Sequence, residues 1–323
     1  MDLQAIIAPV KEDLALFERD LRASLSVDSP LVLAINEHLL NRRGKRVRPA
    51  LVFLSARANG PLPASAVEAG MAIELIHTAT LLHDDVVDES PTRRGQASVN
   101  TKWNNLTSVL MGDYLFSKAF HLLVRIGSPD LMKAVSAATE RVSLGELIEI
   151  QESHNFEIDE SGYLEIIDAK TASLFAASCE AGAILAETGA ATRERLRDYG
   201  SEIGTAFQIS DDMLDLFGSQ EKTGKTEGND IKEGRVTLPL IFALEKAPPG
   251  ERAEMLKILG NGAGASHIDR VRDFVRDRGG VEYARRRAME IEQNARRHIT
   301  DLADSPYKSA LLELARFVVS REA

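Results

Sequence analysis

Helical periodicity runs through most of the chain and limits its fold more than any other feature of the sequence. Apolar residues recur at three- and four-residue steps, as in Leu14, Phe17, Leu21 and Leu25, which is the spacing of one buried face of an α-helix. Strand-like alternation bounded by turn residues is nearly absent. Strong helix formers fill five long segments, namely 64–83, 131–152, 163–187, 192–217 and 281–303. The sequence therefore predicts an all-α fold.

The breaks between these runs are short and rich in Gly, Pro, Asn and Ser, which is typical of helix–helix connections. They fall at 59–61, 127–129, 155–161, 218–234, 248–250 and 260–264. None of them looks like a domain linker, and no repeat of solenoid length is present. We therefore expect one domain over residues 1–323, built from about ten or more helices.

The net charge of −10 over 323 residues argues against a nucleic-acid partner, because a phosphate backbone needs a positive footprint. The single cysteine, Cys179, rules out an intramolecular disulfide and is expected to be a buried helix residue. The N-terminus lacks a signal-peptide pattern, and no apolar run reaches transmembrane length. These features predict a soluble, cytoplasmic protein.

Two aspartate clusters of the same form stand far apart in the chain, DDVVD at 84–88 and DDMLD at 211–215, each inside an apolar helical run. Residues i and i+4 of a helix lie on one face, so Asp84 pairs with Asp88 and Asp211 with Asp215. Carboxylates crowded among apolar residues repel one another unless a cation neutralises them. Mg²⁺ held by one or two carboxylates usually serves a phosphate substrate, so the clusters predict a diphosphate clamp.

Basic residues follow the first cluster and also form a second group upstream. Pro91 is expected to end the helix, which would leave Arg93 and Arg94 in a loop near the carboxylates, suited to bidentate phosphate binding. The upstream group, RRGKRVR at 42–48, indicates either a charged turn or a second phosphate pocket. The acidic total charge weakens a nucleic-acid interpretation of it.

Four further polar features are candidates for a functional site, namely the segment 218–234, Lys170-Thr171, Gln208 and the His83-Asp84 pair. The segment 218–234 contains Gly-Lys-Thr but is no P-loop, because Ser219 stands where Gly is needed and a helix precedes it. It is either a lid that closes on phosphate or a plain solvated loop. Lys170-Thr171 and Gln208 are either structural or able to stabilise positive charge in an ionising substrate. The His83-Asp84 pair is also found in HD-type metal phosphohydrolases, which need further His ligands.

Taken together, these motifs resemble the trans-isoprenyl (polyprenyl) diphosphate synthases over nearly the whole chain. The resemblance implies an all-α isoprenoid-synthase fold with a central catalytic cavity, normally as a homodimer. It also implies three Mg²⁺ ions and two substrates, isopentenyl diphosphate and an allylic diphosphate. Condensation would follow ionisation of the allylic substrate and end with loss of a proton, giving a polyprenyl diphosphate.

The resemblance also assigns roles to individual residues. The direct metal ligands would be Asp84, Asp88 and Asp211, whereas Asp85, Asp212 and Asp215 would act through water or indirect contacts. The allylic diphosphate would contact Arg93, Lys170, Gln208 and Lys225. Isopentenyl diphosphate would contact Lys45, Arg48, His77 and Arg94. Thr171 belongs to the Lys170 motif, and Arg235 stands where the family often has Lys, which puts its contact in question.

Product length should depend on residues below the first cluster. Thr80 and Ala79 lie about one helical turn before Asp84, at about 1.5 Å per residue, where short-chain members of the family carry bulky aromatics. Small residues there predict a long-chain product, such as an octaprenyl to decaprenyl precursor of a quinone side chain. The candidate residues deeper in the cavity are Leu122, Leu123 and Val135.

Four other functions stay open from the sequence alone. One is a short- or medium-chain (farnesyl or geranylgeranyl) diphosphate synthase, and another is a class I terpene cyclase, which the DDMLD cluster and the low aromatic content of 5% disfavour. The third is a non-catalytic partner subunit of a heteromeric synthase, which would lack the metal ligands. The fourth is the HD-type phosphohydrolase.

Overall fold

The structure is a computed structural model that describes residues 2–41, 44–93, 95–218, 228–260 and 265–320. Helices dominate these residues, and the only strands among them are β1 (Thr92–Arg93) and β2 (Gln96–Ala97), a short antiparallel hairpin. This confirms the all-α prediction. The chain forms two compact units, one of residues 1–139, 174–200 and 298–314 and one of residues 140–173, 201–297 and 315–323. The expectation of one domain over residues 1–323 stays a prediction.

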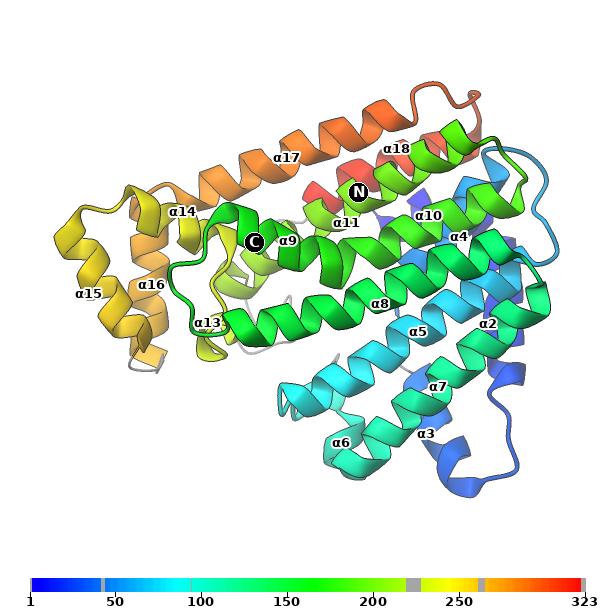
Figure 1. Cartoon of the computed structure of the whole chain (residues 1–323), viewed down its shortest axis with the longest axis horizontal. Helices are drawn as coiled ribbons and strands as arrows, with labels where there is room; N and C mark the ends of the chain where they lie inside the picture. Colours follow the sequence, from blue (N-terminus) through cyan, green and yellow to red (C-terminus); the bar gives the residue numbers. More distant parts are fainter. Residues whose placement is uncertain (1, 42–43, 94, 219–227, 261–264, 321–323) are drawn as a thin grey trace. The chain divides into compact units, whose positions relative to one another are not determined.

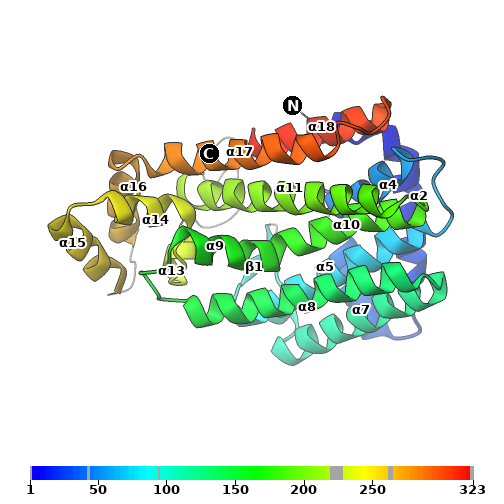
Figure 2. The same ribbon diagram turned by 45° about the horizontal axis from the view of Figure 1, so that its top comes forward.

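The first unit is built around one long buried helix, α5 (Ala66–Val87), along which α4 and α7 pack. Figures 1 and 2 both show α7 beside α5. Besides α5, the first unit contains all or part of α1 (Leu3–Ile6), η1 (Ala8–Val10), α2 (Lys11–Ser24), α3 (Pro30–Leu40), α4 (Val47–Arg57), α6 (Val99–Lys102), α7 (Asn105–Ile126), α8 (Pro129–Glu152), α10 (Ser173–Leu185), α11 (Ala190–Phe217) and α18 (Pro306–Val319).

Helices α5 and α7 run antiparallel. The buried Oγ of Ser108, near the start of α7, donates to the carbonyl of Leu82 at 2.9 Å, near the end of α5. At the opposite ends, Arg125 pairs with Glu68 at 2.8 Å. The two contacts fix the register of α7 against the helix that carries the first aspartate cluster.

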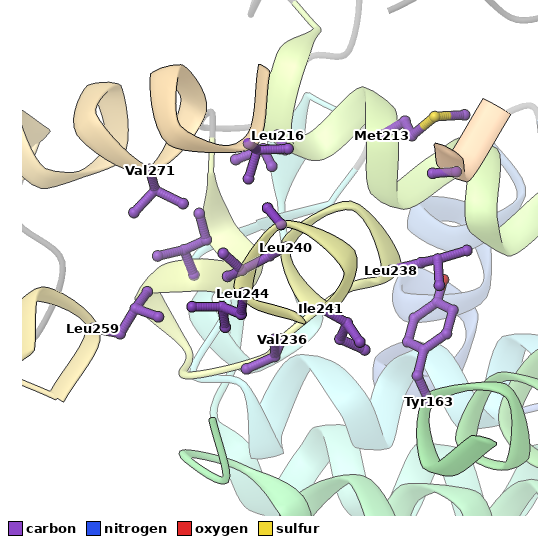
Figure 3. Packing of buried hydrophobic residues seen from close by; sticks show 14 of the residues in the cluster. Tyr163, Met213, Leu216, Val236, Leu238, Leu240, Ile241, Leu244, Leu259 and Val271 are labelled. Atoms are coloured by element: carbon purple, nitrogen blue, oxygen red, sulfur yellow. The ribbon is translucent and has the colours of Figure 1, made fainter. Parts of the chain in front are cut away.

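The second unit has its core around α14 (Leu238–Lys246), as Figure 3 shows. Leu238, Leu240, Ile241 and Leu244 of this helix are all buried and pack with Tyr163, Met213, Leu216 and Val271 of its neighbours. The other elements are the end of α8, α9 (Glu160–Ile167), η2 (Asp168–Ala172), most of α11, α13 (Asn229–Lys232), α15 (Pro249–Gly260), α16 (Ala265–Asp277) and α17 (Gly280–His298).

The structure corrects the sequence predictions in three places. Helix α5 ends at Val87, with Asp88 as its C-cap, so Pro91 does not end it, and Arg93 lies in strand β1 rather than in a loop. The run 163–187 contains α9, the π-helical turn η2 and α10 instead of regular helix throughout. Residues Asn229–Lys232 of the 218–234 break form α13.

Among the described residues, none of the helices has the length and apolarity needed to cross a membrane.

Candidate active site

The first aspartate cluster occupies the last turn of α5 and its cap. Asp84 and Asp88 are half-buried, and the turn that joins them is intact, since the Asp88 N–H donates to the Asp84 carbonyl at 2.8 Å. Asp85 between them is only 2% exposed. The i, i+4 spacing predicted from the sequence therefore brings Asp84 and Asp88 together at the end of the helix.

Asp85 is bound to the hairpin that follows the helix and to α6 after it. Arg93 in β1 donates from Nε to its Oδ1 at 2.7 Å, and Asn100 donates from Nδ2 to its carbonyl at 2.9 Å. A buried carboxylate needs such partners because desolvation of a charge is costly. The hairpin thus fixes Arg93 beside the cluster, as predicted. Arg94 lies outside the described residues.

His83 lies against α7. Its Nε2 is 3.1 Å from the carbonyl of Val109 and 3.5 Å from Oδ1 of Asp113. A Cβ at Gly112 would lie 2.2 Å from the same nitrogen, so a larger residue there would displace the ring from this position. These partners are a backbone carbonyl and one carboxylate, which is not the cluster of His ligands that an HD-type hydrolase requires.

The upstream basic group meets the start of α4. Arg46 is a structural residue, because it pairs with both Glu18 and Glu74 at 2.6 Å. The Arg48 guanidinium lies 4.6 Å from the centre of the Phe175 ring, a cation–π contact that holds it in place. Lys45 is exposed. His77 is half-buried on α5, the helix on which α4 packs.

The predicted chain-length residues all belong to the first unit. Ala79 is fully buried on α5, and Leu122, Leu123 and Val135 are buried as well, whereas Thr80 is half-buried and donates to the His77 carbonyl. Because α5 and α7 are antiparallel, Leu122 and Leu123 lie level with the start of α5. Along α5, this level is roughly ten residues, or about 15 Å, from Ala79 on the side away from Asp84.

The second aspartate cluster lies near the end of α11 and repeats the burial pattern of the first. Asp211 and Asp215 are half-buried, and Asp212 is 6% exposed. The Tyr163 hydroxyl donates to Oδ2 of Asp212 at 2.6 Å, and Gln208 donates from Nε2 to Oδ1 at 2.7 Å. In both clusters, the second aspartate is buried against protein donors while the first and fifth are half-buried.

A polar relay extends from Asp212 to the Lys170-Thr171 motif. The Thr171 hydroxyl donates to Oε1 of Gln208 at 2.8 Å, so Thr171, Gln208 and Asp212 form one chain of hydrogen bonds. Burial raises the pKa of Asp212 to about 7, against the opposite effect of the bonds from Tyr163 and Gln208. Burial, followed by the Asp212 charge, also raises the pKa of Tyr163 well above its usual range.

Lys170 and Arg235 share a carboxylate on α8. Lys170 Nζ donates to Glu146 at 2.9 Å and to Glu149 at 2.6 Å, and Arg235 Nε lies 3.2 Å from Glu149. Arg235 also pairs with Glu233 at 2.6 Å, and its N–H donates to the Asp230 carbonyl at 2.8 Å.

The same segment reaches the second cluster, since the Asp230 N–H donates to Oδ2 of Asp215 at 3.1 Å. The structure therefore joins Lys170, Arg235 and Asp215, three predicted site residues, through Glu149 and Asp230. Lys225 lies outside the described residues.

Sequence reasoning missed Tyr163, Glu146 and Glu149. The two glutamates are three residues apart, so they share one face of α8, and that spacing is the only local signal for them. Nothing near Tyr163 in the sequence points to an aspartate in another helix.

The donor chemistry fits Mg²⁺ bound together with a substrate. Among the described residues, no group of three or more His, Cys, Asp or Glu side chains forms a ready-made metal site. Each cluster instead offers a pair of partly open carboxylates. Mg²⁺ is usually bound in this way, by one or two carboxylates with water and substrate phosphates completing its octahedron.

Comparisons with known proteins identify the class to which this fold and these residues belong. The polyprenyl synthetase family matches residues 29–277. The chain is 38% identical over 319 residues, 98% of each chain, to the all-trans-nonaprenyl-diphosphate synthase (geranyl-diphosphate specific) of Rhodobacter capsulatus. It is 36% identical over 323 residues, 100% of each chain, to the octaprenyl diphosphate synthase of Escherichia coli.

Solved structures point to the same family. A polyprenyl synthase from Caulobacter crescentus, complexed with calcium and isoprenyl diphosphate, superposes with a TM-score of 0.95 at 37% identity, covering 100% of this chain and 98% of that one. The chain therefore belongs to the polyprenyl synthetase family, and it is a prenyltransferase. Membership of this family excludes the HD-type phosphohydrolase.

Proposed function

We propose that the protein condenses isopentenyl diphosphate with an allylic diphosphate to give a long-chain all-trans polyprenyl diphosphate, a precursor of quinone side chains. The observation that carries this proposal is the repeated pattern of the two clusters, a buried aspartate bonded to protein and flanked by two partly open ones. A site that binds a metal–diphosphate complex needs solvent-accessible carboxylates on a rigid frame, and half-buried aspartates beside an anchored one meet both needs.

Three Mg²⁺ ions are proposed as the cofactor, held by Asp84, Asp88 and Asp211, with Asp85, Asp212 and Asp215 in supporting contacts. When bound, they would neutralise the charge that develops on the departing diphosphate. The relative solved with calcium and isoprenyl diphosphate supports a divalent ion in this family. Asp85 and Asp212, whose oxygens accept hydrogen bonds from Arg93, Tyr163 and Gln208, are suited to the supporting role.

The basic residues would bind the two diphosphates. Arg93, Lys170, Gln208 and Lys225 are assigned to the allylic diphosphate, and Lys45, Arg48, His77 and Arg94 to isopentenyl diphosphate. Arg235 acts on the allylic side through Glu149, which it shares with Lys170. Fixed guanidinium and ammonium groups stabilise an anion without reorganisation during the reaction.

Catalysis would consist of positioning and electrostatics. The allylic carbon–oxygen bond breaks and its electron pair leaves with the diphosphate. The double bond of isopentenyl diphosphate attacks the resulting cation, and a proton then passes to the released diphosphate. The Thr171–Gln208 pair presents its dipoles beside Lys170 and orients the leaving group. Holding both reactants in one orientation is worth several orders of magnitude in rate.

The small buried residue at position 79 supports a long product. Ala79 places only a methyl group about one turn below Asp84, and the buried Leu122 and Leu123 of α7 lie level with the start of α5, so the growing chain would stop there and at Val135. Relatives differ in the length of their product. A short chain isoprenyl diphosphate synthase of Methanothermobacter thermautotrophicus is 37% identical over 307 residues, so overall identity does not decide between long and short products.

We also propose a cytoplasmic homodimer that binds no nucleic acid. Leu106, Val109 and Leu110 follow the i, i+3, i+4 spacing on α7 and are 69%, 38% and 57% exposed. An apolar face of this kind marks an interaction surface. If it lies in a dimer, Leu110→Glu should shift the sedimentation mass to that of a monomer, whereas Glu140→Lys on α8 should not.

Metal-dependent condensation tests the proposal. Purified protein is incubated with Mg²⁺, farnesyl diphosphate and labelled isopentenyl diphosphate, and extractable label is counted. We expect turnover that EDTA abolishes and that Asp84→Ala or Asp211→Ala reduces by about three orders of magnitude. A protein that is folded and dimeric yet inactive would instead be a non-catalytic partner subunit.

A further inference from the structure

A π-helical turn, η2 (Asp168–Ala172), interrupts the helical run that carries Lys170 and Thr171. The Ser173 N–H donates to the Asp168 carbonyl five residues back, whereas in an α-helix it would bond to Ala169, four residues back. The turn therefore holds one more residue than an α-helix would. Single π-helical turns of this kind occur frequently at functional sites.

Ser173 closes the turn with its side chain. Its buried hydroxyl donates to the Ala169 carbonyl at 2.6 Å. In an α-helix the Ser173 amide would donate to the Ala169 carbonyl, and here the Ser173 hydroxyl does so instead. Ser173 therefore donates to two successive carbonyls, with its amide to Asp168 and with its hydroxyl to Ala169. This arrangement favours the π-helical register over the α-helical one.

Asp168 anchors the start of the turn to two helices. Arg141 on α8 binds its Oδ2, and the Ser201 hydroxyl on α11 donates to its Oδ1 at 2.9 Å. Both carboxylate oxygens are thus engaged from different directions. The first residue of the turn cannot rotate without breaking one of these bonds.

Gly145 on α8 lies against the back of the turn. A Cβ at this position would be 2.6 Å from the Lys170 nitrogen and 3.0 Å from its Cα. Both atoms belong to the backbone, so no side chain could move aside, and only glycine allows this approach. The contact fixes how closely the Lys170 backbone lies to α8.

The turn directs its two functional side chains to two different helices. Lys170 reaches Glu146 and Glu149 on α8, and Thr171 reaches Gln208 on α11. Loss of the extra residue would rotate a side chain by about 100° about the helix axis. In that register, Lys170 and Thr171 could not keep both sets of contacts.

We propose that Ser173, Asp168 and Gly145 are positioning residues that hold η2 in its π-helical register and thereby set Lys170 and Thr171 for catalysis. This inference rests on the proposed roles of Lys170 and Thr171. None of the three is assigned a contact with substrate: Ser173 and Gly145 touch the backbone of the turn, and Asp168 anchors its first residue. Their effect on the reaction passes through Lys170 and Thr171.

Two serine variants test the inference. Ser173→Ala removes the hydroxyl of the turn, and Ser178→Ala removes an equivalent bond in regular helix, where Ser178 donates to the Leu174 carbonyl at 2.7 Å. We expect Ser173→Ala to lower kcat about tenfold or more at similar Tm, and Ser178→Ala to change kcat by less than about twofold. Equal effects of the two variants would overturn the inference.

A double-mutant cycle separates this inference from the proposed function. If Ser173 acts through Lys170 and Thr171, then Ser173→Ala should cost less than about twofold in a background that carries both Lys170→Ala and Thr171→Ala, because both residues that it positions are gone. Additive losses would refute the positioning role. If Lys170→Ala alone leaves kcat and KM unchanged, the proposed role of Lys170 fails, whatever Ser173 does.

Gly145→Ala gives an independent test, with Gly182→Ala as its control. A Cβ at Gly182 would meet the Val52 carbonyl at 2.4 Å, an equally tight backbone contact between α10 and α4. Both variants should lower Tm. Only Gly145→Ala should also lower kcat of the folded fraction, by about tenfold, and unchanged kcat in that variant would contradict the inference.

Discussion

The hydroxyl of Tyr163 on α9 donates a hydrogen bond of 2.6 Å to the buried carboxylate of Asp212 on α11, 49 residues away. Tyr163→Phe leaves this carboxylate oxygen without its donor. We expect the free energy of unfolding to fall by about 1–3 kcal/mol, the range for a buried bond to a charged group. The Mg²⁺ concentration for half-maximal activity should rise as well, because the second cluster loses a support.

Tyr199→Phe is the matched control for this variant. The Tyr199 hydroxyl is also buried and donates to the Leu311 carbonyl at 2.7 Å. Its loss should lower stability, measured by urea unfolding, without changing the Mg²⁺ dependence. A shift in Mg²⁺ dependence of the same size in both variants would show that Tyr163 acts through stability alone.

The pH dependence of stability provides a second prediction. Burial raises the pKa of Asp212 from 3.8 to about 7, so the folded protein holds this proton more tightly than the unfolded chain. The stability that protonated Asp212 contributes is fully present below about pH 4 and is lost as the pH rises to about 7. Over that range the free energy of unfolding falls by no more than about 1.4 kcal/mol per pH unit.

Asp212→Asn isolates that contribution. Metal-free wild-type protein should lose more stability between pH 5.5 and about pH 7 than Asp212→Asn does, as urea unfolding in EDTA would measure. Parallel curves for the two proteins would show that Asp212 does not titrate in this range.

The single thiol gives a third prediction. Cys179 is fully buried, and burial raises its pKa to about 12, although the Ser55 hydroxyl beside it acts in the opposite direction. The thiolate is the reactive form, so the folded protein should not react with Ellman's reagent at pH 8. One thiol per chain should react in guanidinium chloride, and rapid reaction of the native protein would contradict this placement.

The sequence was sufficient for features that depend on local spacing. The i, i+4 distance within DDVVD and DDMLD places Asp84 with Asp88 and Asp211 with Asp215 wherever the helices lie. Arg93 was predicted near the first cluster because only a few residues separate them. Its place in a hairpin was not predicted, since a two-residue strand gives no periodic signal.

Contacts between distant segments could not be predicted in this way. Tyr163 and Glu149 reach their partners across 49 and 21 residues, and tertiary packing alone brings them there. The π-helical turn was missed for a related reason. Its residues are compatible with an α-helix, and the different register depends on Gly145 and Asp168, which pack against other helices.

Chain length provides a fourth prediction. Ala79→Phe would place a ring about one turn below Asp84, where the side chain is now small and fully buried. We expect the product to shorten by several isoprene units while the first condensation continues. Leu122→Phe, on the level of the start of α5, should shorten the product less. An unchanged product ladder in Ala79→Phe would exclude this position as a length determinant.

The most direct test of the whole account is the product of the wild-type protein itself. Farnesyl diphosphate, excess isopentenyl diphosphate and Mg²⁺ are supplied, and the dephosphorylated products are resolved by reversed-phase chromatography. We expect an all-trans ladder that ends in the octaprenyl to decaprenyl range. A ladder that ends at geranylgeranyl would contradict the long-chain assignment, and the absence of any condensation product would contradict the function as a whole.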